Sequence, residues 1–131
     1  MSIIFDTNKS FEYSIPVIVV GSGGCGLSAA LAVKETGADV LVIERDPTPL
    51  GTTAMSTGLI PGANTRFQRE AQIDDSPDLF KKDILNKTKG QTNEEIALNL
   101  AEESAETVEW LVDNHQVPLS LVDTFLYPGH S

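Results

Sequence analysis

Residues 15–26 read IPVIVVGSGGCG, and this stretch decides the fold of the 131-residue chain. The β-branched run Ile15 to Val20 is typical of a strand buried on both faces of a parallel sheet. An Ala- and Leu-rich helix is predicted over Leu27 to Thr36, with Gly37 closing it, and a second strand over Asp39 to Glu44. Because such crossovers are right-handed, the two strands should be parallel neighbours. The sequence therefore predicts an α/β fold built on a Rossmann-like β-α-β unit.

The glycines between the first strand and the helix follow the pattern G-x-G-x-x-G, at Gly21, Gly23 and Gly26. The pattern carries weight because a strand precedes it, a helix follows it and Glu44 ends the next strand. Gly21 would allow the tight turn, Gly23 the close approach of a pyrophosphate, and Gly26 close packing of helix on strand. The helix N-terminus would add unpaired N–H groups and a partial positive charge. We infer that this loop binds a dinucleotide.

Three residues near this loop raise separate questions. Glu44 should accept hydrogen bonds from both hydroxyls of the adenosine ribose and should repel a 2′-phosphate, which disfavours NADP. Arg45 could pair with such a phosphate, so that exclusion stays open. Cys25 lies at the helix N-terminus, where thiol pKa values tend to fall and a reactive cysteine is conceivable. The position demands a small residue, however, and structural packing is the favoured interpretation of Cys25.

The segment after the second strand favours FAD over NAD. Residues 45–77 show no clear helix or strand, and they include the run LGTTAMSTGLIP at 50–61. A plain NAD domain usually continues into another helix and strand. Small hydroxyl residues could instead supply donors to the ribityl and isoalloxazine parts of FAD, which extend beyond the pyrophosphate. A flexible surface loop is the alternative for this run.

Two helices are predicted in the second half of the chain. The first starts at Ser76 and Pro77, a good N-cap followed by a favoured first helical residue, and ends near Lys89-Gly90. The second opens on a capping box at 92–95, TNEE, and fades near His115. Its apolar positions keep a helical period; they are Ala97, Leu100, Ala101, Ala105, Val108, Leu111 and Val112.

The runs VIVVGSGGCGLSAAL, VIERD and LGTTAMSTGLIPGANTRFQ resemble the N-terminus of the fumarate reductase/succinate dehydrogenase flavoprotein family, which includes flavocytochrome fumarate reductases and 3-ketosteroid dehydrogenases. DDSPDLFKKDI and FLYPGHS are similar to the soluble branch of that family. The resemblance implies an FAD cofactor and an oxidoreductase that acts on carbon–carbon single and double bonds. It implies these cofactor-binding residues: Gly21, Ser22, Gly23, Gly24, Cys25, Gly26, Glu44, Arg45, Gly51, Thr52, Thr53, Ser56, Thr57 and Gly58.

In the family, the substrate-binding acids, arginines and histidines lie in a cap domain and in later segments. We therefore expect residues 1–131 to be the N-terminal part of an FAD-binding domain, a fragment that lacks the cap and has no catalytic residues of its own. A small-molecule substrate is expected only for the complete protein. The alternative is a stand-alone module that binds FAD or NAD without catalysis. A weaker one is a cofactor-free vestige that folds only by self-association.

Composition excludes several classes of partner. The net charge of −10 at pH 7 disfavours nucleic acid and anionic membranes, because both attract basic surfaces. Apolar runs are far shorter than the roughly 20 residues of a membrane span. The N-terminal sequence MSIIFDTNKSFEYSIP lacks the pattern of a signal peptide, and the single cysteine fits a reducing cytoplasm. An incomplete sheet would leave an unpaired edge, so self-association is possible.

Overall fold

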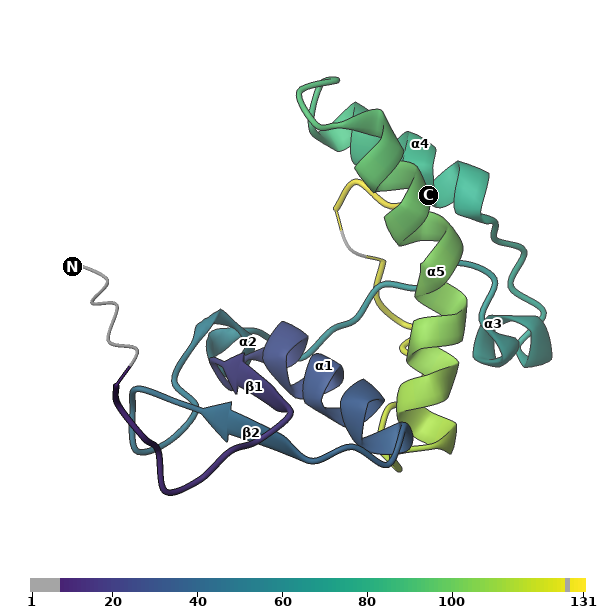
Figure 1. The fold of residues 1–131 in the computed structure, drawn as a ribbon. Coiled ribbons are helices and arrows are strands. Elements are labelled where there is room, and N and C mark those ends of the chain that lie inside the picture. The colour runs from purple at the N-terminus through teal and green to yellow at the C-terminus, as the bar shows by residue number, and fades with distance from the viewer. Residues whose placement is uncertain (1–7, 127) are drawn as a thin grey trace. The chain divides into compact units, whose positions relative to one another are not determined.

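The computed structural model describes residues 8–126 and 128–131, and it divides into two compact units, Met1–Gly58 and Leu59–Ser131 (Figure 1). The first unit contains β1 (Val17–Val20), α1 (Gly24–Glu35), β2 (Val40–Ile43) and α2 (Thr52–Met55). The second contains α3 (Arg66–Glu70), α4 (Pro77–Lys87) and α5 (Glu94–Asp113). Each unit is described by itself.

In the first unit, β1 and β2 form a parallel two-stranded sheet, with Val17 opposite Val40 and Val20 opposite Ile43. Helix α1 connects the strands and packs against both of them. The α/β class and the parallel β-α-β unit are thus confirmed, with strands slightly shorter than predicted. Gly37 follows the end of α1 with φ +80° and donates its N–H to the carbonyl of Lys34, as a helix-terminating glycine does.

The two faces of this sheet differ, which corrects the prediction of strands buried on both faces. Burial alternates along each strand. Val19 lies on the half-buried face, toward α1, because its side chain is close to Gly26 at the start of that helix. The other face is exposed, with fractions between 43% and 83% for its four side chains, Ile18, Val20, Leu41 and Ile43. Nothing within the described residues buries that face, although its side chains are as apolar as those facing α1.

The second unit is built on α4 and α5, which pack together around Ala63, Phe80 and Ala101. Helix α4 begins as predicted: the Ser76 hydroxyl accepts the N–H of Leu79 at 3.2 Å, and Pro77 is the first helical residue. The chain leaves the helix through Lys89 and Gly90, both with positive φ. The predicted end near these residues is therefore close to the observed one.

Helix α5 differs from its prediction at its first turn. The N-cap is Asn93, whose side chain accepts the N–H groups of Glu95 and Ile96, so the predicted TNEE capping box is wrong. An Asn side chain is itself a strong N-cap and moves the start by one residue. Leu100 is half-exposed, at 50%. The buried residues of the helix form a stripe of mostly small side chains: Ala97, Ala101, Ser104 and Val108.

The segment 45–77, predicted to lack regular structure, contains two short helices. Helix α2 is a single turn after Gly51. Helix α3 is fixed by a complete capping box, in which Thr65 and Gln68 bond each other's backbone and side chain. The T-x-x-Q spacing is the sequence signal that the prediction missed. Across the part of the chain that the structure describes, no helix is long and apolar enough to cross a membrane.

Candidate nucleotide-binding site

The glycine loop turns sharply between β1 and α1. Gly21 has φ +104°, a backbone conformation that favours glycine, and its N–H donates to the carbonyl of Ile43 at 2.7 Å. A Cβ added at Gly26 would lie 2.0 Å from the Gly21 carbonyl oxygen and 3.2 Å from Cγ1 of Val19. The start of α1 therefore approaches the end of β1 too closely for any side chain at position 26. This geometry matches the structural roles that the sequence predicted for Gly21 and Gly26.

The N-terminus of α1 is open at Gly23. This N-cap residue has extended backbone and no side chain with which to cap the helix. The hydroxyl of Thr53, from the single turn α2, caps the helix instead by accepting the N–H of Gly24 at 2.9 Å. A Cβ added at Gly23 would meet only Thr53 Oγ1, at 3.7 Å. The protein itself therefore leaves room at Gly23, as a loop that must admit a pyrophosphate requires.

Glu44 lies directly after β2, and its exposed carboxylate accepts four hydrogen bonds. Oε2 accepts the N–H of Ser22 at 2.9 Å and its hydroxyl at 2.7 Å. Oε1 accepts the N–H of Arg45 at 2.7 Å and that of Asp46 at 3.2 Å. These donors, the Ser22 hydroxyl foremost, lower the pKa of Glu44 from 4.5 to about 2. The structure thus brings Glu44 to the glycine loop, 22 residues earlier in the chain, and keeps it ionised.

Two neighbouring side chains bear on the sequence predictions. The guanidinium of Arg45 pairs with Asp46 at 3.0 Å, so its charge is already opposed by a carboxylate. That pairing raises the pKa of Arg45 and argues against a role in holding a 2′-phosphate. Cys25 is exposed, so the expectation that its side chain is packed is wrong. Cys25 is the second residue of α1.

The predicted flavin-side segment 51–58 is exposed, and it is attached to the glycine loop through Thr53. Its own turn is held by Ser56, whose hydroxyl donates to the Thr53 carbonyl at 2.8 Å and accepts the N–H of Gly58 at 3.1 Å. Gly58 has φ +77°, which explains the glycine there. The structure therefore places Thr53 at the helix N-terminus, while the other predicted residues of the segment lie on its exposed surface: Gly51, Thr52, Ser56, Thr57 and Gly58.

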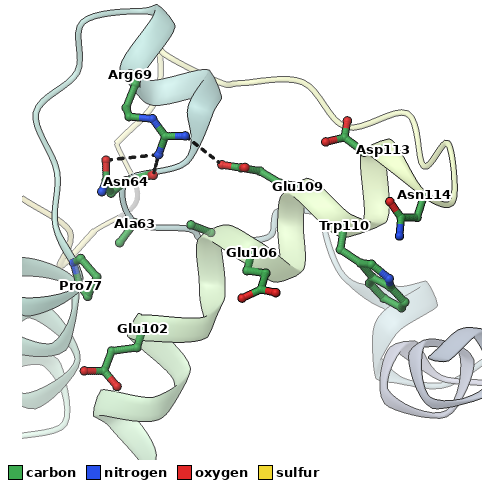
Figure 2. Close-up of a pocket in the computed structure, with 11 residues that line it drawn as sticks. Ala63, Asn64, Arg69, Pro77, Glu102, Glu106, Glu109, Trp110, Asp113 and Asn114 are labelled. Carbon is green, nitrogen blue, oxygen red and sulfur yellow. Dashed lines mark hydrogen bonds and ion pairs between the residues drawn. The ribbon is translucent and has the colours of Figure 1, made fainter.

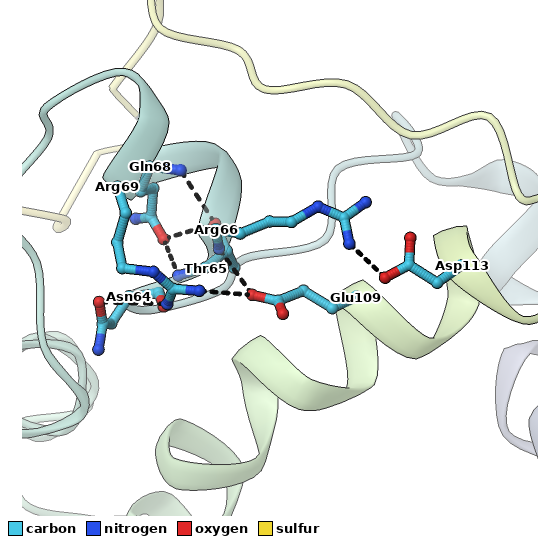
Figure 3. Close-up of polar contacts among 7 residues, drawn as sticks. All are labelled: Asn64, Thr65, Arg66, Gln68, Arg69, Glu109 and Asp113. Carbon is cyan, nitrogen blue, oxygen red and sulfur yellow. Dashed lines mark hydrogen bonds and ion pairs between the residues drawn. The ribbon is translucent and has the colours of Figure 1, made fainter.

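The second unit holds a polar cluster that the sequence did not predict (Figure 3). The guanidinium of Arg66 on α3 donates to the carboxylate of Asp113 on α5. The backbone N–H of Arg66 donates to the carboxylate of Glu109 at 2.6 Å. Arg69 lies 3.5 Å from the same Glu109. The bond from Arg66 lowers the pKa of Asp113. The sequence did offer a signal for this cluster. Two arginines lie three residues apart on α3 and two acids lie four residues apart on α5, spacings that place each pair on one face of its helix. The cluster fastens α3 to α5.

Beside this cluster is an open pocket of about 490 Å³ (Figure 2). Its walls come from α5, from the segment that carries α3 and from Pro77 at the start of α4. Glu102, Glu106 and Glu109 make it acidic. Its one cationic lining residue, Arg69, is already paired with Glu109. A phosphate-bearing ligand would meet repulsion there. The glycine loop of the first unit, with its helix N-terminus and open Gly23, is the better candidate for a dinucleotide.

Comparisons with known proteins identify the family of the chain. The family model described as "FAD binding domain" matches residues 16–126. The NADH:fumarate oxidoreductase of Klebsiella pneumoniae is 38% identical over 106 residues, which are 81% of this chain and 12% of that protein. The chain thus spans about an eighth of the length of that relative.

Two solved structures share the fold. The open conformation of a flavocytochrome c3 fumarate reductase superposes with a TM-score of 0.76 at 29% identity, over 88% of this chain and 20% of that one. The 3-ketosteroid-Δ4-(5α)-dehydrogenase from Rhodococcus jostii RHA1 gives 0.72 at 34% identity, over 82% and 22%. These likenesses agree with the predicted resemblance and with FAD as the cofactor. The chain belongs to the FAD binding domain family, in its fumarate reductase type.

Proposed function

We propose that this chain is the Rossmann-like, N-terminal FAD-binding part of an oxidoreductase that acts on a carbon–carbon single or double bond of a small molecule. The observation that carries the proposal is the open glycine loop at Gly23 beside an ionised Glu44. The names of the relatives, fumarate reductases and a ketosteroid dehydrogenase, support the reaction type. Residues 1–131 would supply cofactor binding, and a cap outside them would supply substrate contacts. The single cysteine supports a reducing compartment such as the cytoplasm.

In this proposal two segments of the chain bind different parts of FAD. The N-terminus of α1 would hold the pyrophosphate in the room that Gly23 leaves, with the Thr53 hydroxyl beside it. Glu44 would accept the hydroxyls of the adenosine ribose. The exposed residues of 51–58 would meet the ribityl chain and the flavin ring. Bound FAD supplies the electron-accepting ring; the chain's part is to bind and orient it.

A stand-alone module that holds NAD without redox chemistry is not favoured, because the matching family is one of FAD binding. The two readings differ in a simple property of the purified protein. An FAD-loaded chain is yellow, whereas an NAD-loaded chain absorbs no visible light. Colour alone does not decide whether the cofactor is held at the glycine loop, which requires the variants described below.

The 131-residue chain is expected to retain FAD weakly after reconstitution, because it carries only part of the cofactor's surroundings in the longer relatives. The measurement is gel filtration of the chain after incubation with excess FAD, with absorbance followed at visible and ultraviolet wavelengths. A parallel run with NAD is the control. Flavin that elutes wholly apart from the protein, with NAD retained instead, would contradict the proposal.

The chain is also expected to self-associate through the exposed face or edge of its small sheet, where Val20 is 83% exposed and Ile18 55%. Static light scattering should show a mass above that of the monomer that rises with concentration. Val20→Glu should lower that mass. Leu126→Glu, which adds the same charge at an exposed apolar residue of the second unit, is the matched control. A monomer at all concentrations would refute the proposal.

A further inference from the structure

Ser22 is the residue through which the glycine loop holds Glu44. Its side chain is buried, with 9% exposure, and buried hydroxyls require a hydrogen-bond partner. That partner is Oε2 of Glu44 at 2.7 Å, and the same oxygen accepts the N–H of Ser22 at 2.9 Å. Ser22 thus donates two hydrogen bonds to the same carboxylate oxygen. The other oxygen is held by backbone N–H groups of Arg45 and Asp46, which any sequence would supply.

We propose that Ser22 is a positioning residue for FAD: its hydroxyl fixes Glu44 in the orientation that accepts the adenosine ribose. This inference rests on the proposed function, because it assigns the ribose to Glu44. Its physical basis is preorganisation, since a carboxylate already held in place loses less freedom when the ligand binds. Ser22 therefore acts on the cofactor through Glu44.

No unpaired charge on the segments packed against Glu44 sets its pKa, so the Ser22 hydroxyl has the largest effect. On the segments packed against it, residues 17–26 contain a single ionisable side chain, that of Cys25. Lys34 of α1 pairs with Asp39 at the opposite end of β2. Arg45, which follows Glu44 in the chain, is paired with Asp46 on the same segment. The pKa of Glu44 is accordingly lowered first by the Ser22 hydroxyl and then by backbone N–H groups.

The sign of the pH effect follows from this depressed pKa. The stability that the hydrogen bonds to the carboxylate contribute is fully present above pH 4.5, the ordinary value, and is lost as the pH falls through about 2. Ser22→Ala removes the largest cause and keeps the three backbone donors. The midpoint of the Glu44 titration should therefore rise toward 4.5 in that variant. Ser22→Thr, which retains the hydroxyl, should keep the midpoint low.

The test is a double-mutant cycle on FAD affinity, measured at pH 7 by the quenching of flavin fluorescence. Ser22→Ala should weaken binding about three- to tenfold, the size of one hydrogen bond. In the background of Glu44→Ala the same change should matter less than about twofold, because no side-chain acceptor for the Ser22 hydroxyl remains at position 44. Ser22→Thr should restore the affinity. Equal losses in both backgrounds would overturn the proposal, because Ser22 would then act without Glu44.

A second measurement needs no cofactor and separates this inference from the proposed function. Amide chemical shifts of Ser22 and Asp46, both donors to Glu44, report its titration in the ligand-free chain by NMR. The expected result is a higher midpoint in Ser22→Ala and an unchanged one in Ser22→Thr. An unchanged midpoint in Ser22→Ala would overturn the positioning role, whatever the FAD affinity. Absence of FAD binding by the parent chain would instead overturn the proposed function.

Discussion

The Gly26→Ala chain is expected to lose a large part of the stability of the β1-α1-β2 unit. The added Cβ would lie 2.0 Å from the carbonyl oxygen of Gly21 and 3.1 Å from its carbonyl carbon. Both are backbone atoms of a turn that the Gly21 N–H fastens to Ile43, so they have little freedom to move away. Overpacking of this kind costs about 1–3 kcal/mol and sometimes more. A unit of this size has only about 3–9 kcal/mol of stability in total.

Amide hydrogen exchange over β1, α1 and β2 measures the loss directly, and chemical denaturation gives its free energy. Gly23→Ala, three residues earlier in the same loop, is the matched control because its Cβ meets only Thr53 Oγ1 at 3.7 Å. The control should keep parental protection in both strands. Protection unchanged in Gly26→Ala as well would show that the helix does not approach the strand as closely as the structure has it.

The sequence predicted the first unit well because its signals are local. The β-branched strand, the three glycines and the Ala-rich helix each act within a few residues, and together they specify a crossover. Burial of the sheet was predicted less well. Apolar residues such as Ile18 and Val20 indicate a strand buried on both faces, yet both are exposed here. An apolar pattern indicates that a strand face is suited to burial, but it does not show which segment covers that face.

For the site, the sequence identified residues but not their bonds. That Glu44 ends β2 near the loop follows from the spacing, whereas its double contact with Ser22 depends on how two distant turns meet. The cap that Thr53 provides to α1 is a similar case, because it joins residues 29 apart. Cys25 shows the opposite error. A small residue in a glycine loop was read as packed, but a position on the first turn of a helix can equally face outward.

Gly23→Val is expected to abolish measurable FAD binding while the unit stays folded. Position 23 is the N-cap of α1, with φ −73° and ψ 176°, an extended conformation that a β-branched residue adopts without strain. The protein offers one contact near that Cβ, the hydroxyl of Thr53 at 3.7 Å, so an isopropyl group has room in the absence of ligand. With FAD present, the same space would be needed for the pyrophosphate to reach the helix N-terminus.

The loss should be about 100-fold or more, since a steric clash of about 3 kcal/mol already gives that factor. Gly23→Ala should fall between the parent and the valine variant. Glu44→Ala should lose about ten- to hundredfold, the range for hydrogen bonds to a charged group. Titrations of FAD fluorescence measure all three, and hydrogen exchange in the strands verifies their folding. Parental affinity in a folded Gly23→Val chain would place the pyrophosphate elsewhere, because no phosphate could lie against that helix end beside the isopropyl group.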